Sequence, residues 1–167
     1  DLDGVRAVVD DSVAALIVEP MMGAAGCIPA EPGFLAGLRD ICDRTGALLI
    51  FDEVMTSRMS GGGVQLRSGV QPDLTTLGKY LAGGMTFGAF GGRTDLMAAF
   101  DPARAGTLTH GGTSNNNVVT MAGGVAALSE LLTSDVLDAL FRRGESLRGR
   151  VAGVLDQSSL PLCVTGM

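Results

Sequence analysis

The sequence has a single lysine, a single histidine, a single tyrosine and no tryptophan among its 167 residues. Charged residues make up only 18% of the chain, and the formal net charge at pH 7 is −6. Acidic and basic residues are interspersed, so the sequence lacks the positively charged surface that attracts nucleic acid or an anionic membrane. We therefore expect neither of these partners.

Cysteine is also scarce and widely spaced. Cys27, Cys42 and Cys163 form no C-x-x-C pair, which argues against a zinc site and a disulfide framework and favours reduced, buried thiols. We expect no metal site. The first residues lack the basic start and apolar run of a signal peptide, and no apolar run is long enough to span a membrane. These absences predict a cytoplasmic protein.

Hydrophobic residues make up 46% of the chain, enough for one globular domain with a core. The first half of the sequence predicts a strand–helix–strand unit. Val13–Val18 is a continuous apolar run that indicates a strand buried on both faces, and the turn-rich segment 21–30 follows it. Apolar residues then recur at helical spacing between Pro32 and Gly46, and 47–51 is a second buried strand. We expect a right-handed parallel crossover.

The second half predicts shorter strands and longer helices. Strands are expected at 74–77 and 87–91, followed by a brief helix capped by Thr94 and a loop over 101–112. A helix is expected over 117–132 with an apolar face formed by Val118, Met121, Ala122, Val125, Leu128 and Leu132.

Another helix is expected to start near Ser134. Its inward-facing side chains are predicted to be Leu137, Leu140, Phe141, Leu147, Val151, Val154 and Leu155. Arginines and Glu145 occupy the opposite face of this helix, which predicts a solvated surface. The last residues, 160–167, indicate the beginning of a strand. Because so few strands precede it, we expect the chain to be an internal segment of a larger α/β protein.

The single lysine is the most informative residue. Eleven arginines meet the general need for positive charge, yet only a lysine can lose its proton and form a Schiff base. Lys79 follows one predicted strand, and Asp52 follows another in the same sheet, where α/β proteins bind ligands. A lysine amine and an aspartate bonded to a pyridine nitrogen are what pyridoxal phosphate chemistry requires. Alternatively, these are a solvated lysine and a loop aspartate, and Glu53 is a helix-start or ion-pair carboxylate.

A family pattern favours the first interpretation. The segments that carry it are Val18-Glu19-Pro20, Pro32-Gly33-Phe34-Leu35, Leu38-Arg39, the run Gly46–Val54, Pro72-Asp73-Leu74, Leu77-Gly78-Lys79 and Gly83-Gly84. Together they resemble the class III aminotransferases over residues 13–128. The resemblance implies a dimeric pyridoxal 5′-phosphate enzyme of fold type I. It also implies that residues 1–132 belong to the large cofactor-binding domain and 133–167 to a connecting helix and the start of the small domain.

The same resemblance assigns roles to individual residues. It makes Lys79 the Schiff-base lysine, Asp52 the partner of the pyridine nitrogen, and Val54 a residue packed against the cofactor ring. Thr113 would reach the cofactor phosphate of the neighbouring subunit, so a homodimer is expected. Asn117 is followed by Val118 where the family usually has proline, which makes the start of the next helix less certain. The motif gives His110 no chemistry, and we expect it to be structural.

The sequence suggests two activities. Met55 is similar to the glutamate-1-semialdehyde aminomutases, whereas Ser57 and the run Asn115–Asn117 depart from their pattern. We therefore expect an aminotransferase of the aminomutase-like branch, acting on a small amino donor and carbonyl acceptor, with the aminomutase as the alternative. An inactive segment is a further alternative, because the family's main phosphate-binding loop is not in this chain, and we expect the chain by itself to be inactive. A nucleotide-binding domain is disfavoured because no P-loop is present.

Overall fold

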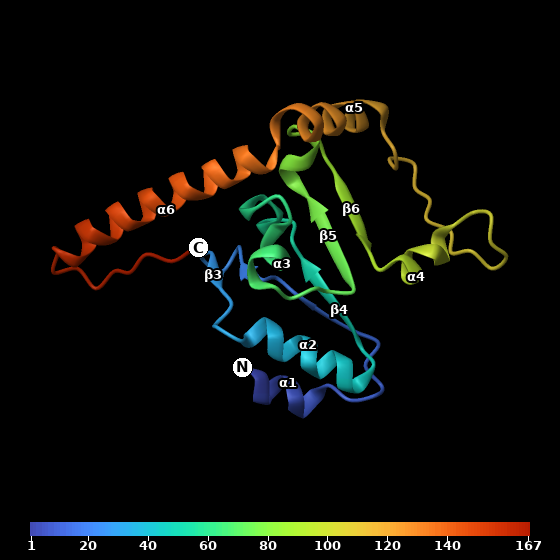
Figure 1. The fold of residues 1–167 in the computed structure, drawn as a ribbon, viewed down its shortest axis with the longest axis horizontal. Helices are drawn as coiled ribbons and strands as arrows, with labels where there is room; N and C mark the ends of the chain where they lie inside the picture. The colour runs from blue at the N-terminus through green and yellow to red at the C-terminus, as the bar shows by residue number, and fades with distance from the viewer.

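The computed structural model describes residues 1–167 and is built around a four-stranded sheet with the order β1-β4-β5-β6 (Figure 1). The strands are β1 (Ala15–Val18), β4 (Leu48–Asp52), β5 (Leu74–Gly78) and β6 (Gly88–Gly92). The first three are parallel, and β6 is antiparallel to β5. The predicted α/β class is confirmed, and the carboxyl ends of three strands meet at one edge.

Helix α2 (Phe34–Thr45) and α3 (Gly63–Ser68) cover one face of the sheet. The core residues that they share with β4 are Leu35, Leu38, Cys42, Ala47, Leu49, Phe51 and Val64. Alternate residues of a strand point to opposite faces, and residues paired between strands share a face. Register therefore places Ile17, Ile50, Asp52 and Thr76 on the other face. Ile17 is 62% exposed, so the prediction that β1 is buried on both faces is wrong.

Four short helices and strands were not predicted. Helix α1 (Leu2–Val8) packs against α2, and its first turn is capped by the Asp1 carboxylate. The turn-rich segment contains an antiparallel pair, β2 (Met21–Met22) and β3 (Ile28–Pro29). Helix α3 lies in a segment for which no helix or strand was predicted. Each is short, so the periodic signal that identifies longer helices and strands is absent.

The connection between β5 and β6 includes a 3₁₀ turn, η2 (Lys79–Ala82), and β6 leads to α4 (Thr94–Met97) and the turn η3 (Ala98–Phe100). The predicted strands and brief helix are therefore present. However, Thr94 does not cap α4: the residue before the helix is Arg93, which makes no side-chain cap. Arg93 instead pairs with Asp95 and with Asp73.

Asp73 connects three parts of the fold. Its carboxylate accepts hydrogen bonds from Arg39 of α2 at 2.7 Å, Arg93 at 2.8 Å and the Leu49 amide of β4 at 2.8 Å. Only 5% of Asp73 is exposed. Burial raises its pKa, but the hydrogen bonds from Arg93, the Leu49 amide and Arg39 outweigh it and hold the pKa below the ordinary value. Asp73 is therefore ionised and joins helix, central strand and last strand.

Helix α5 (Val118–Ala126) continues as one π-helical stretch, η4 (Ala127–Leu131), so the predicted helix is confirmed. Its start does not need the missing proline, because the Asn117 side chain accepts hydrogen bonds from the Val119 and Thr120 amides. The predicted inward face is wrong in part. Val118, Val125 and Leu128 are exposed, whereas the residues buried on this helix are Thr120, Gly124 and Ala127.

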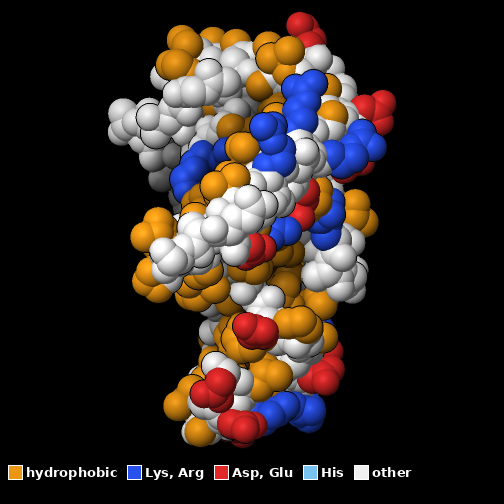
Figure 2. Space-filling view, turned by 90° about the vertical axis from the view of Figure 1, so that its left-hand side faces the viewer, with side chains coloured by type: hydrophobic (Ala, Val, Ile, Leu, Met, Phe, Trp, Pro, Cys, Tyr) orange, Lys and Arg blue, Asp and Glu red, His pale blue; other side chains and the backbone are white.

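Helix α6 (Ser134–Asp156) extends away from the sheet (Figure 1). Among its predicted inward residues only Leu137 is buried, and Phe141, whose ring lies 3.6 Å from the Arg67 guanidinium, is half-buried. Leu140, Leu147, Val151 and Val154 are exposed. Hydrophobic side chains accordingly appear between charged ones in Figure 2. Residues 160–167 form no strand, contrary to expectation. No helix in the structure combines the length and the hydrophobicity needed to cross a membrane.

Candidate active site

Asp52 is the last residue of β4 and is held by its neighbours. Its Oδ1 accepts hydrogen bonds from the Val54 amide and the Thr76 hydroxyl, both at 3.1 Å. Thr76 lies directly opposite on β5, which fixes the carboxylate at the edge of the sheet. Its other oxygen, Oδ2, accepts no hydrogen bond from the protein. Asp52 therefore offers one oriented carboxylate oxygen to a ligand on the open face of the sheet.

Lys79 lies just beyond β5, three residues after the partner of Asp52, and begins the turn η2. Its backbone φ is 55°, an uncommon left-handed conformation for a residue other than glycine. The side chain is exposed, and its amine takes part in none of the ion pairs in the structure. Backbone strain of this kind is typical of functional sites. The structure thus brings Lys79 and Asp52 to the same edge of the sheet, as the sequence predicted.

Val54 lies between the two strand ends. A β-carbon built on Gly78 would lie 3.5 and 3.7 Å from the two methyl groups of Val54, and 3.1 Å from the carbonyl oxygen of Phe87. The chain approaches so closely here that only glycine fits without adjustment before Lys79. Val54 therefore packs beside the residue that precedes the lysine, which is compatible with a place near a ligand held by Lys79.

Glu53 has a structural role that the sequence left open. It is fully buried, and its carboxylate accepts hydrogen bonds from the Thr56 hydroxyl and from the Val64 and Gln65 amides at the start of α3. The first amides of a helix have no acceptor within the helix, and a carboxylate stabilises both these amides and the positive end of the helix dipole. The alternative of a helix-start carboxylate is therefore the correct one for Glu53.

Thr113 makes no hydrogen bond to Asp52, whose partners are Val54 and Thr76. It lies in an exposed turn of the long connection between η3 and α5. His110, on the same connection, contacts two aromatic rings edge-on, with centroid distances of 5.4 Å to Phe90 and 6.1 Å to Phe100. His110 thus packs against β6 and η3, in agreement with the structural role expected for it.

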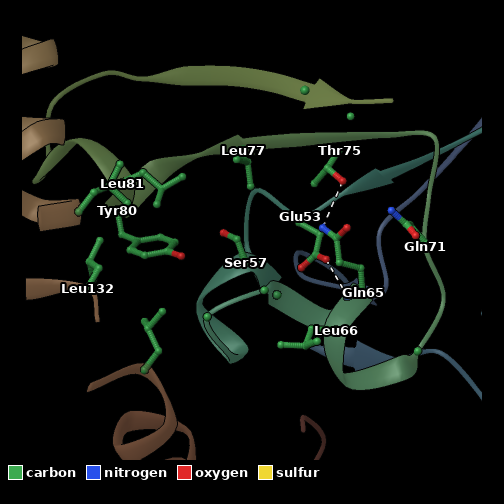
Figure 3. Close-up of a pocket in the computed structure, with 18 residues that line it drawn as sticks. Glu53, Ser57, Gln65, Leu66, Gln71, Thr75, Leu77, Tyr80, Leu81 and Leu132 are labelled. Carbon is green, nitrogen blue, oxygen red and sulfur yellow. Dashed lines mark hydrogen bonds between the residues drawn. The ribbon is translucent and has the colours of Figure 1, made fainter. Parts of the chain in front are cut away.

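A cavity of about 730 Å³ opens on the opposite face of the sheet (Figure 3). Glu53, Gln65, Thr75 and Tyr80 contribute polar atoms to it, and its apolar lining comes mainly from Leu66, Leu77, Leu81, Leu128, Leu132 and Leu137. Asp52 and Lys79 do not line it. Because Thr75 and Leu77 alternate with Thr76 along β5, this cavity and Asp52 lie on different faces.

The residues can hold an aldehyde cofactor better than a metal ion. No group of three or more histidine, cysteine, aspartate or glutamate side chains is arranged to bind a metal. By contrast, an unpaired amine and a carboxylate with a free, oriented oxygen are the two protein groups that a pyridine aldehyde requires. The three cysteines form no disulfide, and only Cys42 is buried. The expectation of buried thiols is therefore wrong for the half-buried Cys27 and the exposed Cys163.

Comparison with known proteins identifies the family of the chain. A family model described as aminotransferase class-III matches residues 1–162. The chain belongs to the class III aminotransferases. Among members of this family, it is 53% identical to a β-phenylalanine transaminase of Variovorax paradoxus over 155 residues, which are 93% of this chain and 36% of that protein. It is 49% identical to an uncharacterized aminotransferase of Schizosaccharomyces pombe over 81% of the chain and 31% of that protein.

Solved class III structures cover the whole chain. The crystal structure of the Variovorax paradoxus β-phenylalanine aminotransferase matches with a TM-score of 0.95 over 100% of this chain and 39% of that one. A glutamate-1-semialdehyde aminomutase of Pseudomonas aeruginosa matches less closely, with 31% identity and a TM-score of 0.80 over 94% of this chain and 37% of that one. The predicted family and fold type are therefore confirmed. The chain spans between 31% and 39% of the length of these relatives.

Proposed function

We propose that this chain is part of a pyridoxal 5′-phosphate-dependent aminotransferase in which Lys79 is the covalent attachment point of the cofactor. The observation that carries the proposal is the presence of two groups at one edge of the sheet. One is the Lys79 amine, which has no ion-pair partner and lies on a strained turn, and the other is the oriented Asp52 carboxylate at the end of the neighbouring strand. When bound, the cofactor supplies an aldehyde for the lysine and a protonated ring that withdraws electrons from the substrate. The family of this chain is known to include structures with this cofactor bound.

Each residue has a separate task in this proposal. The free oxygen of Asp52, Oδ2, would hold the proton on the ring nitrogen. The Thr76 hydroxyl and the Val54 amide donate to the other oxygen, Oδ1, and so keep the carboxylate in place. When a substrate amine takes the place of the Lys79 amine, the freed Lys79 amine would serve as the base that takes a proton from the substrate carbon carrying the amino group. The Val54 side chain packs against the ring face.

Variants of the complete protein test these roles. Lys79→Arg keeps the positive charge but cannot attach the cofactor, so we expect loss of the cofactor's visible absorption band and about a 10³-fold or greater loss of transamination. Asp52→Asn should retain attachment but lower turnover about 100-fold or more. Borohydride reduction followed by peptide mass mapping should find a pyridoxyl group on Lys79. A mapped group on any other lysine would disprove the assignment.

We further propose that the amino donor is a β-amino acid with an aromatic substituent. This rests on the 53% identity to a β-phenylalanine transaminase, against 31% to an aminomutase. The complete protein should convert β-phenylalanine only when an oxo acid is added as acceptor. An aminomutase would instead isomerise glutamate 1-semialdehyde with no acceptor present, and that result would favour the alternative activity.

A homodimer with Thr113 serving the partner's site completes the proposal. The exposed position of Thr113 supports such a role. Mixed dimers of one Lys79→Arg chain and one Thr113→Val chain can test this role. If the threonine acts across the interface, one site of the mixed dimer has both Lys79 and Thr113. If the threonine acts within its own chain, neither site has both. A purified mixed dimer is expected to have about half the wild-type activity, because one of its two sites is intact, and an equal random mixture about a quarter. No recovery would refute the assignment.

We expect the 167-residue chain alone not to turn over substrate. The sheet face that carries Asp52 is open to solvent, as the exposure of Ile17 on the same face indicates. Charge stabilisation in such a site is weak, because water screens it. Transamination by the purified chain at a rate near that of the complete protein would contradict this expectation.

A further inference from the structure

The turn that carries Lys79 is held from two sides by residues that have no role in the proposed chemistry. Lys79 adopts a left-handed backbone, and such a conformation persists in a non-glycine residue only where the surrounding structure enforces it. The next three residues complete the 3₁₀ turn η2, in which Leu81 and Ala82 are buried. The residues that pack against this turn therefore determine the backbone conformation of Lys79 and the direction in which its side chain leaves the turn.

Arg58 holds the first side. It belongs to the 3₁₀ turn η1 (Thr56–Met59), which follows the Asp52 segment, and its Nε donates a hydrogen bond to the Met55 carbonyl at 3.0 Å. Its guanidinium lies over the Tyr80 ring, 4.6 Å from the centroid, and pairs with no carboxylate. Attraction between a guanidinium and an aromatic face orients both groups. The segment that carries Asp52 is thereby connected to the residue after Lys79.

Gly123 of α5 holds the second side. A β-carbon at Gly123 would lie 3.0 Å from the Ala82 carbonyl oxygen, which is tighter than ordinary contact. One at Gly124 would lie 3.6 Å from the Leu81 carbonyl oxygen, which is ordinary van der Waals contact. The helix backbone therefore touches the end of η2 at Gly123 and leaves more space at Gly124.

We propose that Arg58, Tyr80 and Gly123 are positioning residues that hold the Lys79 turn in its left-handed form. This inference rests on the proposed function, in which Lys79 attaches the cofactor. If either support is removed, the backbone of Lys79 can relax to the more favourable right-handed conformation and its amine leaves the edge shared with Asp52. The three residues would then act through Lys79 without touching the cofactor or the substrate.

Two matched pairs of variants in the complete protein test the proposal. Tyr80→Leu removes the aromatic face, whereas Tyr80→Phe keeps it. Gly123→Ala introduces the tight contact with Ala82, whereas Gly124→Ala gives the same gain in helix propensity without it. The readouts are the apparent Kd for pyridoxal phosphate, the fraction of Lys79 that carries a pyridoxyl group after borohydride reduction, and kcat and KM.

We expect Tyr80→Leu and Gly123→Ala each to weaken loading of Lys79 roughly two- to fivefold, as the size of one such contact implies. Their kcat should fall with KM little changed, because the lysine and not the substrate site is displaced. Tyr80→Phe and Gly124→Ala should load like the unchanged protein. If Gly123→Ala does not fold, Arg58→Met against the exposed control Arg150→Met gives the same comparison.

Equal loading within each pair would overturn the proposal. Equal losses within each pair, accompanied by equal falls in thermal stability, would also overturn it, because the residues would then stabilise the fold in general. Failure of the unchanged protein to load pyridoxal phosphate on Lys79 has a different meaning, since it refutes the proposed function and this inference with it.

Discussion

Asp73→Asn should destabilise the fold strongly although Asp73 is outside the candidate active site. Asparagine can still accept the hydrogen bond from the Leu49 amide, but it removes the charge between Arg39 and Arg93. Loss of one partner of a buried ion pair costs about 3–5 kcal/mol. The Arg93 side chain is 50% exposed and also pairs with Asp95. Solvent and the ion pair with Asp95 therefore offset part of the free-energy cost of losing the Asp73 charge. We therefore expect a loss of about 2–3 kcal/mol.

The matched control is Asp43→Asn. Asp43 also pairs with Arg39, at 2.8 Å, but its side chain is 62% exposed. An exposed pair contributes little, so we expect a change of about 0.5 kcal/mol or less. Urea unfolding of the complete protein measures both variants, and hydrogen exchange at the Leu49 amide reports on the local effect. An equal effect of the two substitutions would refute the idea that Asp73 stabilises the fold through its buried charge.

The pH dependence gives a second test. Because the pKa of Asp73 in the folded protein lies below its ordinary value of 3.8, its charge stabilises the fold fully above that value. This stabilisation is lost as the pH falls through the depressed pKa. The difference in unfolding free energy between wild type and Asp73→Asn should therefore be constant near neutral pH and shrink below about pH 4. A difference that grows on acidification would contradict the assigned charge state.

Two further predictions concern the start of α3. Glu53→Gln replaces the buried carboxylate by an amide that cannot accept from all three donors. The substitution should lower the unfolding free energy by about 2 kcal/mol. A change below about 0.5 kcal/mol in urea unfolding would argue against this capping role. Gly63→Ala should cost clearly more than Gly46→Ala in the same assay. Both glycines have positive φ, but only a β-carbon at Gly63 collides with the Glu53 carboxylate, and equal costs would contradict that contact.

The two central residues of the candidate site could be predicted from the sequence because their signals are local. Asp52 directly follows an apolar strand, and Lys79 is a chemically distinct residue in a chain otherwise supplied with arginine. The carboxyl ends of parallel strands necessarily meet at one edge, so the sequence order was enough to bring them together. The left-handed backbone of Lys79 left no comparable signal, because nothing in its residue type requires it.

The contacts of Asp73 could not be predicted, because its partners Arg39 and Arg93 are 34 and 20 residues away in the sequence. Only the tertiary fold shows that these charges meet. The error on α6 has a different cause. Periodicity correctly identified the apolar side of the helix, but it says nothing about which element covers that side. In this chain Leu147 and Val154 remain exposed.

The reversed direction of β6 has a consequence for how the lysine can move. A parallel strand after β5 would have required a long crossover, usually through a helix, whereas the antiparallel β6 returns through a short connection. Lys79 therefore lies in a loop whose two ends are joined by the ladder between Gly78 and Gly88. The two ends of the loop are therefore fixed to the sheet, and Lys79 directly follows one of these ends. Sequence variation after Lys79 can then alter the loop while the lysine stays tied to the sheet.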